Sequence, residues 1–161
     1  MAQDMFIKID GIEGESLDAS HTNEIEVLEW HWDVSQHSNM HSGSGGGSGK
    51  ASVNDFCFTH YTDKASPNLL SYCLTGKHIK NIVFVIRKAG GDPLEYLTIT
   101  FTDTIITRVE MSGSSEDETR PRELVKFSFT KVTQDYVMQN SEGSKSGVIS
   151  ASYDVKANQS S

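Results

Sequence analysis

The sequence predicts a mainly β protein: a closed or nearly closed β-barrel of about seven or eight strands with one short α-helix on its flank. Apolar and polar residues alternate with a period of two through most of the chain, a pattern typical of half-buried strands. One alternating segment, residues 96–111, is far longer than the usual strand of roughly five or six residues. Closing a sheet into a barrel requires long, bent strands of this kind.

The other expected strands follow one another along the chain. Residues 5–9 alternate and end at the Asp10-Gly11 turn. In residues 25–34 the apolar set changes parity between Val27 and Leu28, which requires a β-bulge or a strand buried on both faces. The remaining strands are expected in residues 53–62, 82–86, 125–136 and 149–155. The chain has 161 residues, so we expect one domain over residues 1–161.

The longest strand is expected to present one apolar face. Its apolar residues of equal parity are Leu97, Ile99, Phe101, Ile105, Val109 and Met111. Threonines and Arg108 fill most of the opposite face. This shared parity predicts that the six apolar side chains lie on one face of a long, bent strand.

The pattern of residues 66–76 predicts the single helix. Ser66-Pro67 supplies an N-cap and a proline in the first turn, and Gly76 ends the helix. The apolar side is expected to consist of Leu69, Leu70, Cys73 and Leu74. Packing of this side against the sheet would bury the Cys73 thiol in the core.

Charge and targeting signals restrict the partners. The formal net charge of −8 argues against binding of a nucleic-acid backbone and against attraction to an anionic membrane. No apolar run is long enough for membrane insertion, and the first residues lack the pattern of a signal peptide. We therefore expect synthesis in the cytoplasm, with Cys57 and Cys73 as free thiols.

Candidate catalytic and metal-binding residues form no recognisable pattern. His31, His37 and His41 lie close in the sequence, but their spacing matches no metal-site motif. No nucleophile elbow is present, and the run ending in Lys50 lacks the Ser or Thr of a phosphate-binding loop. The sequence therefore predicts no enzyme, no cofactor and no metal.

Residues 42–49 consist only of glycine and serine. Such a run is usually a flexible linker between domains. Here fewer than fifty residues precede it, too few for a separate stable domain. We therefore expect a long surface loop over residues 37–50, ordered by contact with a partner.

Taken together in chain order, these segments resemble the hemolysin-coregulated protein (Hcp) family, the inner-tube subunit of bacterial type VI secretion systems. The resemblance covers almost the entire chain, although no single motif is specific. It rests on DMFIKI at residues 4–9, GES at 14–16, His21, EIEVL at 24–28, WHW at 30–32, MH at 40–41 with the glycine loop, GK at 49–50, FT at 58–59, Tyr61, DK at 63–64, SPNL at 66–69, GKH at 76–78, IRKAG at 86–90 and EYL at 95–97.

The resemblance implies that six copies form a ring and that rings stack into a hollow tube inside a contractile sheath. It further implies that the tube is secreted with a spike at its tip, carrying effector proteins in its lumen. Secretion by that apparatus needs no signal peptide. A different hypothesis is a stand-alone, lectin-like β-sandwich binding module, which would be monomeric.

The resemblance also implies roles for particular residues. His31 would lie on the lumen-facing sheet and contact cargo. The extended loop would contact a neighbouring subunit or the next ring. Its expected contact residues are His37, Met40, His41, Ser42, Gly43, Gly45, Gly46, Gly47, Gly49 and Lys50.

Overall fold

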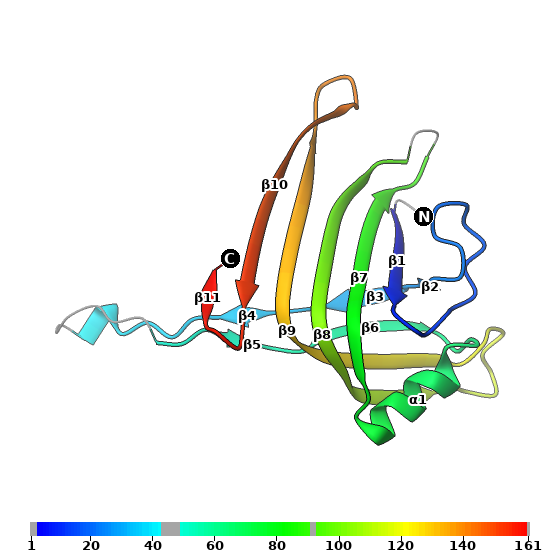
Figure 1. Ribbon diagram of the computed structural model, residues 1–161. Helices are drawn as coiled ribbons and strands as arrows, with labels where there is room; N and C mark the ends of the chain where they lie inside the picture. The colour runs from blue at the N-terminus through cyan, green and yellow to red at the C-terminus, as the bar shows by residue number, and fades with distance from the viewer. Residues whose placement is uncertain (1–2, 43–48, 91–92, 161) are drawn as a thin grey trace.

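The computed structural model describes residues 3–42, 49–90 and 93–160. Its elements in chain order are β1 (Gln3–Ile9), β2 (Ile25–Glu26), β3 (Glu29–His31), β4 (Val34–Ser35), the 3-10 turn η1 (Met40–Ser42), β5 (Ser52–Val53), β6 (Phe56–Tyr61), α1 (Ser66–Thr75), β7 (His78–Lys88), β8 (Glu95–Ser112), β9 (Arg122–Gln139), β10 (Lys145–Asp154) and β11 (Gln159–Ser160) (Figure 1). This mainly β content with one short α-helix in the described residues confirms the predicted fold class. Five of these strands have only two or three residues, so the number of strands is larger than the sequence predicts.

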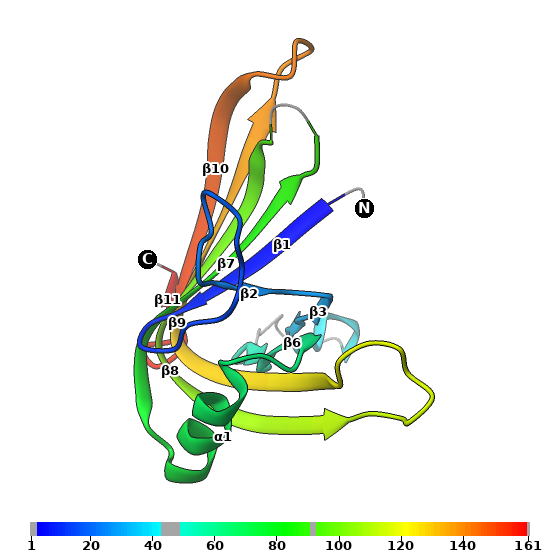
Figure 2. The ribbon, with the colours of Figure 1, turned by 90° about the vertical axis from the view of Figure 1, so that its right-hand side faces the viewer.

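Seven strands form one antiparallel layer, the long sheet. Its order is β11-β10-β9-β8-β7-β1-β2. The strands β7 to β10 follow one another in the chain and pair as successive neighbours, because short connections join antiparallel strands most easily. Figure 2 shows the upper part of this sheet rising away from the rest of the molecule.

A second layer, the four-strand sheet, is made by the lower halves of the two longest strands together with β6 and β3. Residues 131–139 of β9 pair with β10, whereas residues 122–127 of β9 pair with β6. The resulting order is β3-β6-β9-β8. Because β8 and β9 belong to both layers, each bends between them, as predicted for long strands of a barrel.

The circuit of paired strands is nearly closed. After β2, which pairs with β1, the Val27 N–H still donates to the Met5 carbonyl at 2.9 Å. The next amide, of Leu28, donates instead to Thr59 of β6 at 2.8 Å. The parity change seen in the sequence therefore marks the point at which the chain changes partners, and β2 and β3 remain separate strands.

Aromatic rings fill the space between the two layers. The fully buried phenylalanines are Phe56, Phe58, Phe84, Phe101 and Phe127. The Phe56 ring lies 5.0–5.3 Å from three of the others, centroid to centroid. Tilted aromatic pairs at this spacing add attraction beyond the burial of area, so this cluster holds the layers together.

The shared parity expected for the apolar residues of 96–111 does not hold along the whole strand. Asp103 has a positive φ of 53°, and the pairing with β9 shifts between Ile106 and Arg108. As a result Ile106, not Ile105, is fully buried, and Met111 is exposed. The bend between the two layers requires this irregularity, because a straight strand could not serve both sheets.

The helix forms where predicted but differs in its cap and in its packing. The N-cap is Ala65 rather than Ser66, and Gly76 ends the helix with a left-handed φ of 65°. Leu69 is fully buried and Cys73 is partly buried against the core. Leu70 and Leu74 are exposed, so the predicted apolar side is only partly used.

Candidate functional site

The side chain of His31 points away from the core. The Trp30 ring before it packs on Phe56 and Phe84, and the Trp32 ring after it packs on Phe101 and Phe129. Because alternate residues of a strand face opposite sides, His31 must lie on the outer face of the four-strand sheet. Its side chain is 77% exposed, and its Nε2 lies 3.6 Å from Asp33 Oδ1.

Cross-strand register extends this position into a row. His31 pairs with Cys57, Cys57 with Lys126, and Lys126 with Arg108. Directly opposite residues share a face, so the row crosses all four strands of the sheet. The pKa of the Cys57 thiol is raised, mainly because the side chain is partly buried. The thiol is therefore uncharged at neutral pH. We call these four residues the basic row.

An acidic row lies beside it on the same face. Two residues further along each strand, the next position on this face joins Glu29, Thr59, Leu124 and Glu110. Arg108 contacts Glu110 along its own strand, with Nη2 and Oε2 3.3 Å apart. The outer face therefore carries neighbouring bands of opposite charge.

Residues 33–42 and 49–54 form the described part of an extended arm. At its base Val34 pairs with Val53, and Asn54 Nδ2 donates to Asp33 Oδ2 at 2.6 Å. The indole of Trp32 donates to the Asn54 carbonyl at 2.9 Å and so fastens the arm to the core. Figure 1 shows the arm running out past β10 and β11.

Most described residues of the arm are exposed and can contact another molecule. His37, Met40 and His41 are exposed, as are Gly49 and Lys50. Across the outer arm the Gly49 N–H donates to the His37 carbonyl at 3.4 Å, a long hydrogen bond. Ser42 ends the turn η1, whereas Gly43, Gly45, Gly46 and Gly47 lie outside the described residues.

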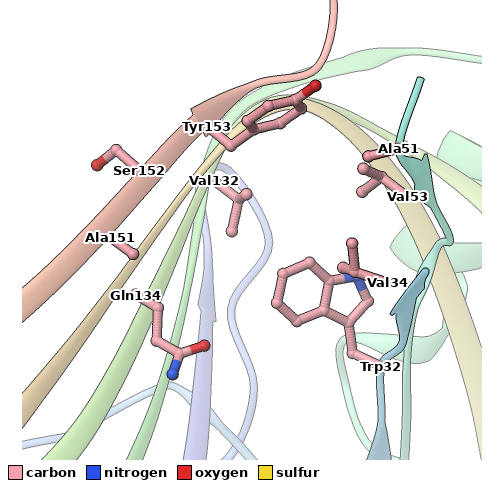
Figure 3. Close-up of a pocket in the computed structure, with 9 residues that line it drawn as sticks. All are labelled: Trp32, Val34, Ala51, Val53, Val132, Gln134, Ala151, Ser152 and Tyr153. Atoms are coloured by element: carbon pink, nitrogen blue, oxygen red, sulfur yellow. The ribbon is translucent and has the colours of Figure 1, made fainter. Parts of the chain in front are cut away.

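An apolar pocket of about 330 Å³ lies between the arm and the long sheet. Figure 3 shows side chains from both walls facing one another across it. The lining residues are Trp32, Val34, Ala51, Val53, Val132, Gln134, Ala151, Ser152 and Tyr153. Almost all of its surface is hydrocarbon, so it suits an apolar side chain rather than a charged ligand.

Neither a metal site nor a membrane span is found in the part of the chain that the structure describes. In these residues, no three His, Cys, Asp or Glu side chains gather as metal ligands would. No described helix is long and apolar enough to cross a membrane.

The family of this chain follows from comparison with known proteins. A family model described as "Type VI secretion system effector, Hcp" matches residues 6–136. The chain belongs to the Hcp family. It is 47% identical to the protein hcp1 of Pseudomonas aeruginosa over 148 residues, which cover 91% of each chain.

Solved structures of Hcp proteins share this fold. Hcp1 from Salmonella typhimurium superposes with a TM-score of 0.84 at 52% identity, covering 100% of both chains. A type VI secretion system effector from Yersinia pestis gives a TM-score of 0.77 at 68% identity, covering 94% of this chain and 99% of the other. Hcp membership makes this chain a structural tube protein of type VI secretion.

Three polar clusters of this Hcp protein were not predicted from the sequence. The two ring nitrogens of His21 lie 2.9 Å from a Glu24 carboxylate oxygen and 2.6 Å from a Glu95 carboxylate oxygen, and the ring stacks on Phe6. Arg87 binds Asp4 and Asp18, and so joins the loop 10–24 to β1 and β7. The hydrogen bond from Arg87 holds the pKa of Asp18 below its usual value.

The third cluster is a buried pair. His60 and Glu123 are opposite one another on β6 and β9, and His60 Nε2 lies 2.8 Å from Glu123 Oε1. Both side chains are buried among the core residues of the four-strand sheet. No local sequence signal joins residues 63 positions apart; only the register does.

Proposed function

We propose that this Hcp protein forms hexameric rings that stack into a hollow tube, is secreted, and carries effector proteins in the tube lumen. Family membership supports this proposal. The observation that carries it is the pair of free edges of the four-strand sheet. Among the described residues, β3 pairs only with β6, and residues 106–112 of β8 pair only with β9.

Free edges favour ring closure. Unpaired backbone N–H and C=O groups at a sheet edge invite pairing with another chain. The two edges lie at opposite ends of one sheet, so contact between them is heterologous and repeats around a ring. Six copies would bring the outer faces of all six four-strand sheets to the inside of the ring.

The arm would strengthen the assembly. Its exposed described residues lie beyond the body of the subunit and would contact a neighbouring subunit or the next ring; they include His37, Met40, His41, Gly49 and Lys50. Such contacts are modest singly and gain strength because every subunit repeats them.

The outer face would line the lumen. His31 projects from this face and is free to touch cargo. Effector proteins in the lumen would therefore meet the basic and acidic rows. The chain would be made in the cytoplasm and released together with the spike when the sheath contracts.

Native mass spectrometry and electron microscopy test the ring. We expect a hexamer and ring-shaped particles. A strict monomer at high concentration would contradict the proposal and would favour a stand-alone binding module.

Deletion of residues 42–49 tests the arm. The barrel should stay folded, because the base of the arm is fixed by Trp32, Asp33 and Asn54. Ring or tube formation should weaken. Unchanged assembly would show that the segment is a tolerated surface loop.

Co-purification of an effector tests the lumen. His31→Glu should reduce recovery of the effector with intact rings. The matched control is His78→Glu, because the His78 side chain is also well exposed but lies on β7. Equal recovery with wild type and both variants would exclude a cargo contact at His31.

A further inference from the structure

Part of the core-facing side of the long sheet has no cover among the residues that the structure describes. Tyr136 of β9 lies opposite Ile149 of β10 and Leu97 of β8. These residues have the same parity as Val132, Tyr153 and Phe101, which contact the core. Tyr136 is nevertheless 46% exposed and Ile149 is 60% exposed. We call Tyr136, Met138 and Ile149 the uncovered face.

The position of the four-strand sheet explains this exposure. Figure 2 shows this sheet covering only the lower part of the long sheet, while β8, β9 and β10 continue upward. The pocket beneath the arm lies on the same side of the sheet. Its residues Val132, Gln134 and Ala151 are two or four positions from Tyr136 and Ile149 along the same strands, and side chains at even spacing share a face. Apolar surface thus continues from the pocket onto the uncovered face.

A second apolar surface lies on α1. Leu70 and Leu74 are four residues apart, so they share one side of the helix. Leu69 is fully buried against the core, whereas Leu74 is 77% exposed. The exposed stripe therefore points away from the body of its own subunit.

The free sheet edges set the relation between these surfaces. Suppose that residues 106–112 of one copy lie beside β3 of a second copy. Each four-strand sheet then continues into the next, so the two copies are four strand spacings apart, about 19 Å. The helix α1 packs on β8, so it moves with that edge. The helix of the first copy then lies beyond β3 of the second copy. The long sheet of the second copy, with its uncovered face, extends in the same direction (Figure 2).

We infer that α1 of one copy docks through Leu70 and Leu74 on the uncovered face of the next copy. This inference rests on the proposed ring and names the surfaces that join its subunits. Each subunit offers one stripe and one uncovered face, so the contact is heterologous and closes only when the ring is complete. The occupant is a second copy of this chain.

Cross-linking tests the contact directly. In the full chain carrying both Leu74→Cys and Ile149→Cys, a short bismaleimide should give a ladder of products ending at six subunits. The two single variants, which also contain the native Cys57 and Cys73, are the controls and should give no ladder. Native mass spectrometry of the same samples reports whether rings are present.

The outcomes separate the two proposals. A ladder specific to the double variant supports docking of α1 on the uncovered face. Intact hexamers without this ladder overturn the docking while the ring stands. Monomers without a ladder overturn both.

A charge substitution gives an independent measurement. Leu74→Glu should lower the affinity between subunits at least tenfold, seen as ring dissociation on dilution. Leu17→Glu is the matched control, because Leu17 is 92% exposed on the loop after β1. Equal dissociation of both variants, or of neither, would overturn the inference.

Discussion

Replacement of Trp32 should both destabilise the fold and release the arm. Its ring contacts Phe101 and Phe129 at about 6 Å, centroid to centroid, and its Nε1 donates to the Asn54 carbonyl at 2.9 Å. Two aromatic contacts contribute about 0.5–1.5 kcal/mol each, and a hydrogen bond contributes a similar amount. We therefore expect Trp32→Ala to lower the free energy of unfolding by about 3 kcal/mol, near the lower end for a large aromatic residue.

Trp32→Phe separates the two contributions. It keeps an aromatic ring in the core but removes the indole donor, so we expect a loss of only about 1 kcal/mol. Urea unfolding followed by circular dichroism measures both variants, at a fixed protein concentration because assembly adds apparent stability. Native mass spectrometry follows the rings, which should weaken more in Trp32→Ala, since the base of the arm loses its attachment.

Two results would refute this reasoning. A loss below about 1 kcal/mol for Trp32→Ala would mean that the ring contacts do not fasten the arm. Equal losses for the alanine and phenylalanine variants would mean that the hydrogen bond, not ring packing, carries the effect. Val148→Ala is the control, because Val148 is half exposed and its truncation should be nearly neutral.

Three further predictions concern the loop after β1 and the buried pair. Gly14→Ala should cost about 1–3 kcal/mol in urea unfolding, because a Cβ there would lie 2.5 Å from a backbone oxygen; wild-type stability would contradict this. The pKa of Asp18 is lowered by Arg87, so its contact persists at neutral pH and is lost only as the pH falls below the ordinary value near 4. Pepsin should therefore cut this loop faster as the pH falls through that range, and Asp18→Asn should remove this dependence. Glu123→Ala should cost about 1–3 kcal/mol in urea unfolding by leaving the buried His60 unpaired, with Glu123→Gln less harmful; equal losses would argue against a hydrogen-bond role.

Local patterns in the sequence indicated the longer strands, and they agree with the direction of His31. Alternation over WHW fixes which residues point inward, because side chains of a strand alternate between its faces. The change of parity at Val27 and Leu28 likewise predicts an irregularity. In the structure the chain changes its hydrogen-bonding partner at this point, from β1 to β6.

Periodicity failed where one element serves two environments. The bend at Asp103 moves Ile106 into the core and leaves Met111 exposed. In a strand of regular alternation Met111 would share the face of Phe101, and Ile106 would lie on the opposite face. Similarly, Leu70 and Leu74 look like core residues of a helix, yet nothing in their own subunit covers them among the described residues. An apolar residue in the sequence indicates burial, but it does not say whether the cover comes from its own chain.

The sequence by itself therefore determined the β class, the helix, the outward position of His31 and the resemblance to the Hcp family, because these depend on local alternation and on ordered segments. Only the tertiary structure decided the basic row, the His60–Glu123 pair and the uncovered face. Each of these depends on which residues of distant strands lie opposite one another. Register between distant strands is fixed where their apolar faces meet in the core, so it cannot be derived from either segment alone.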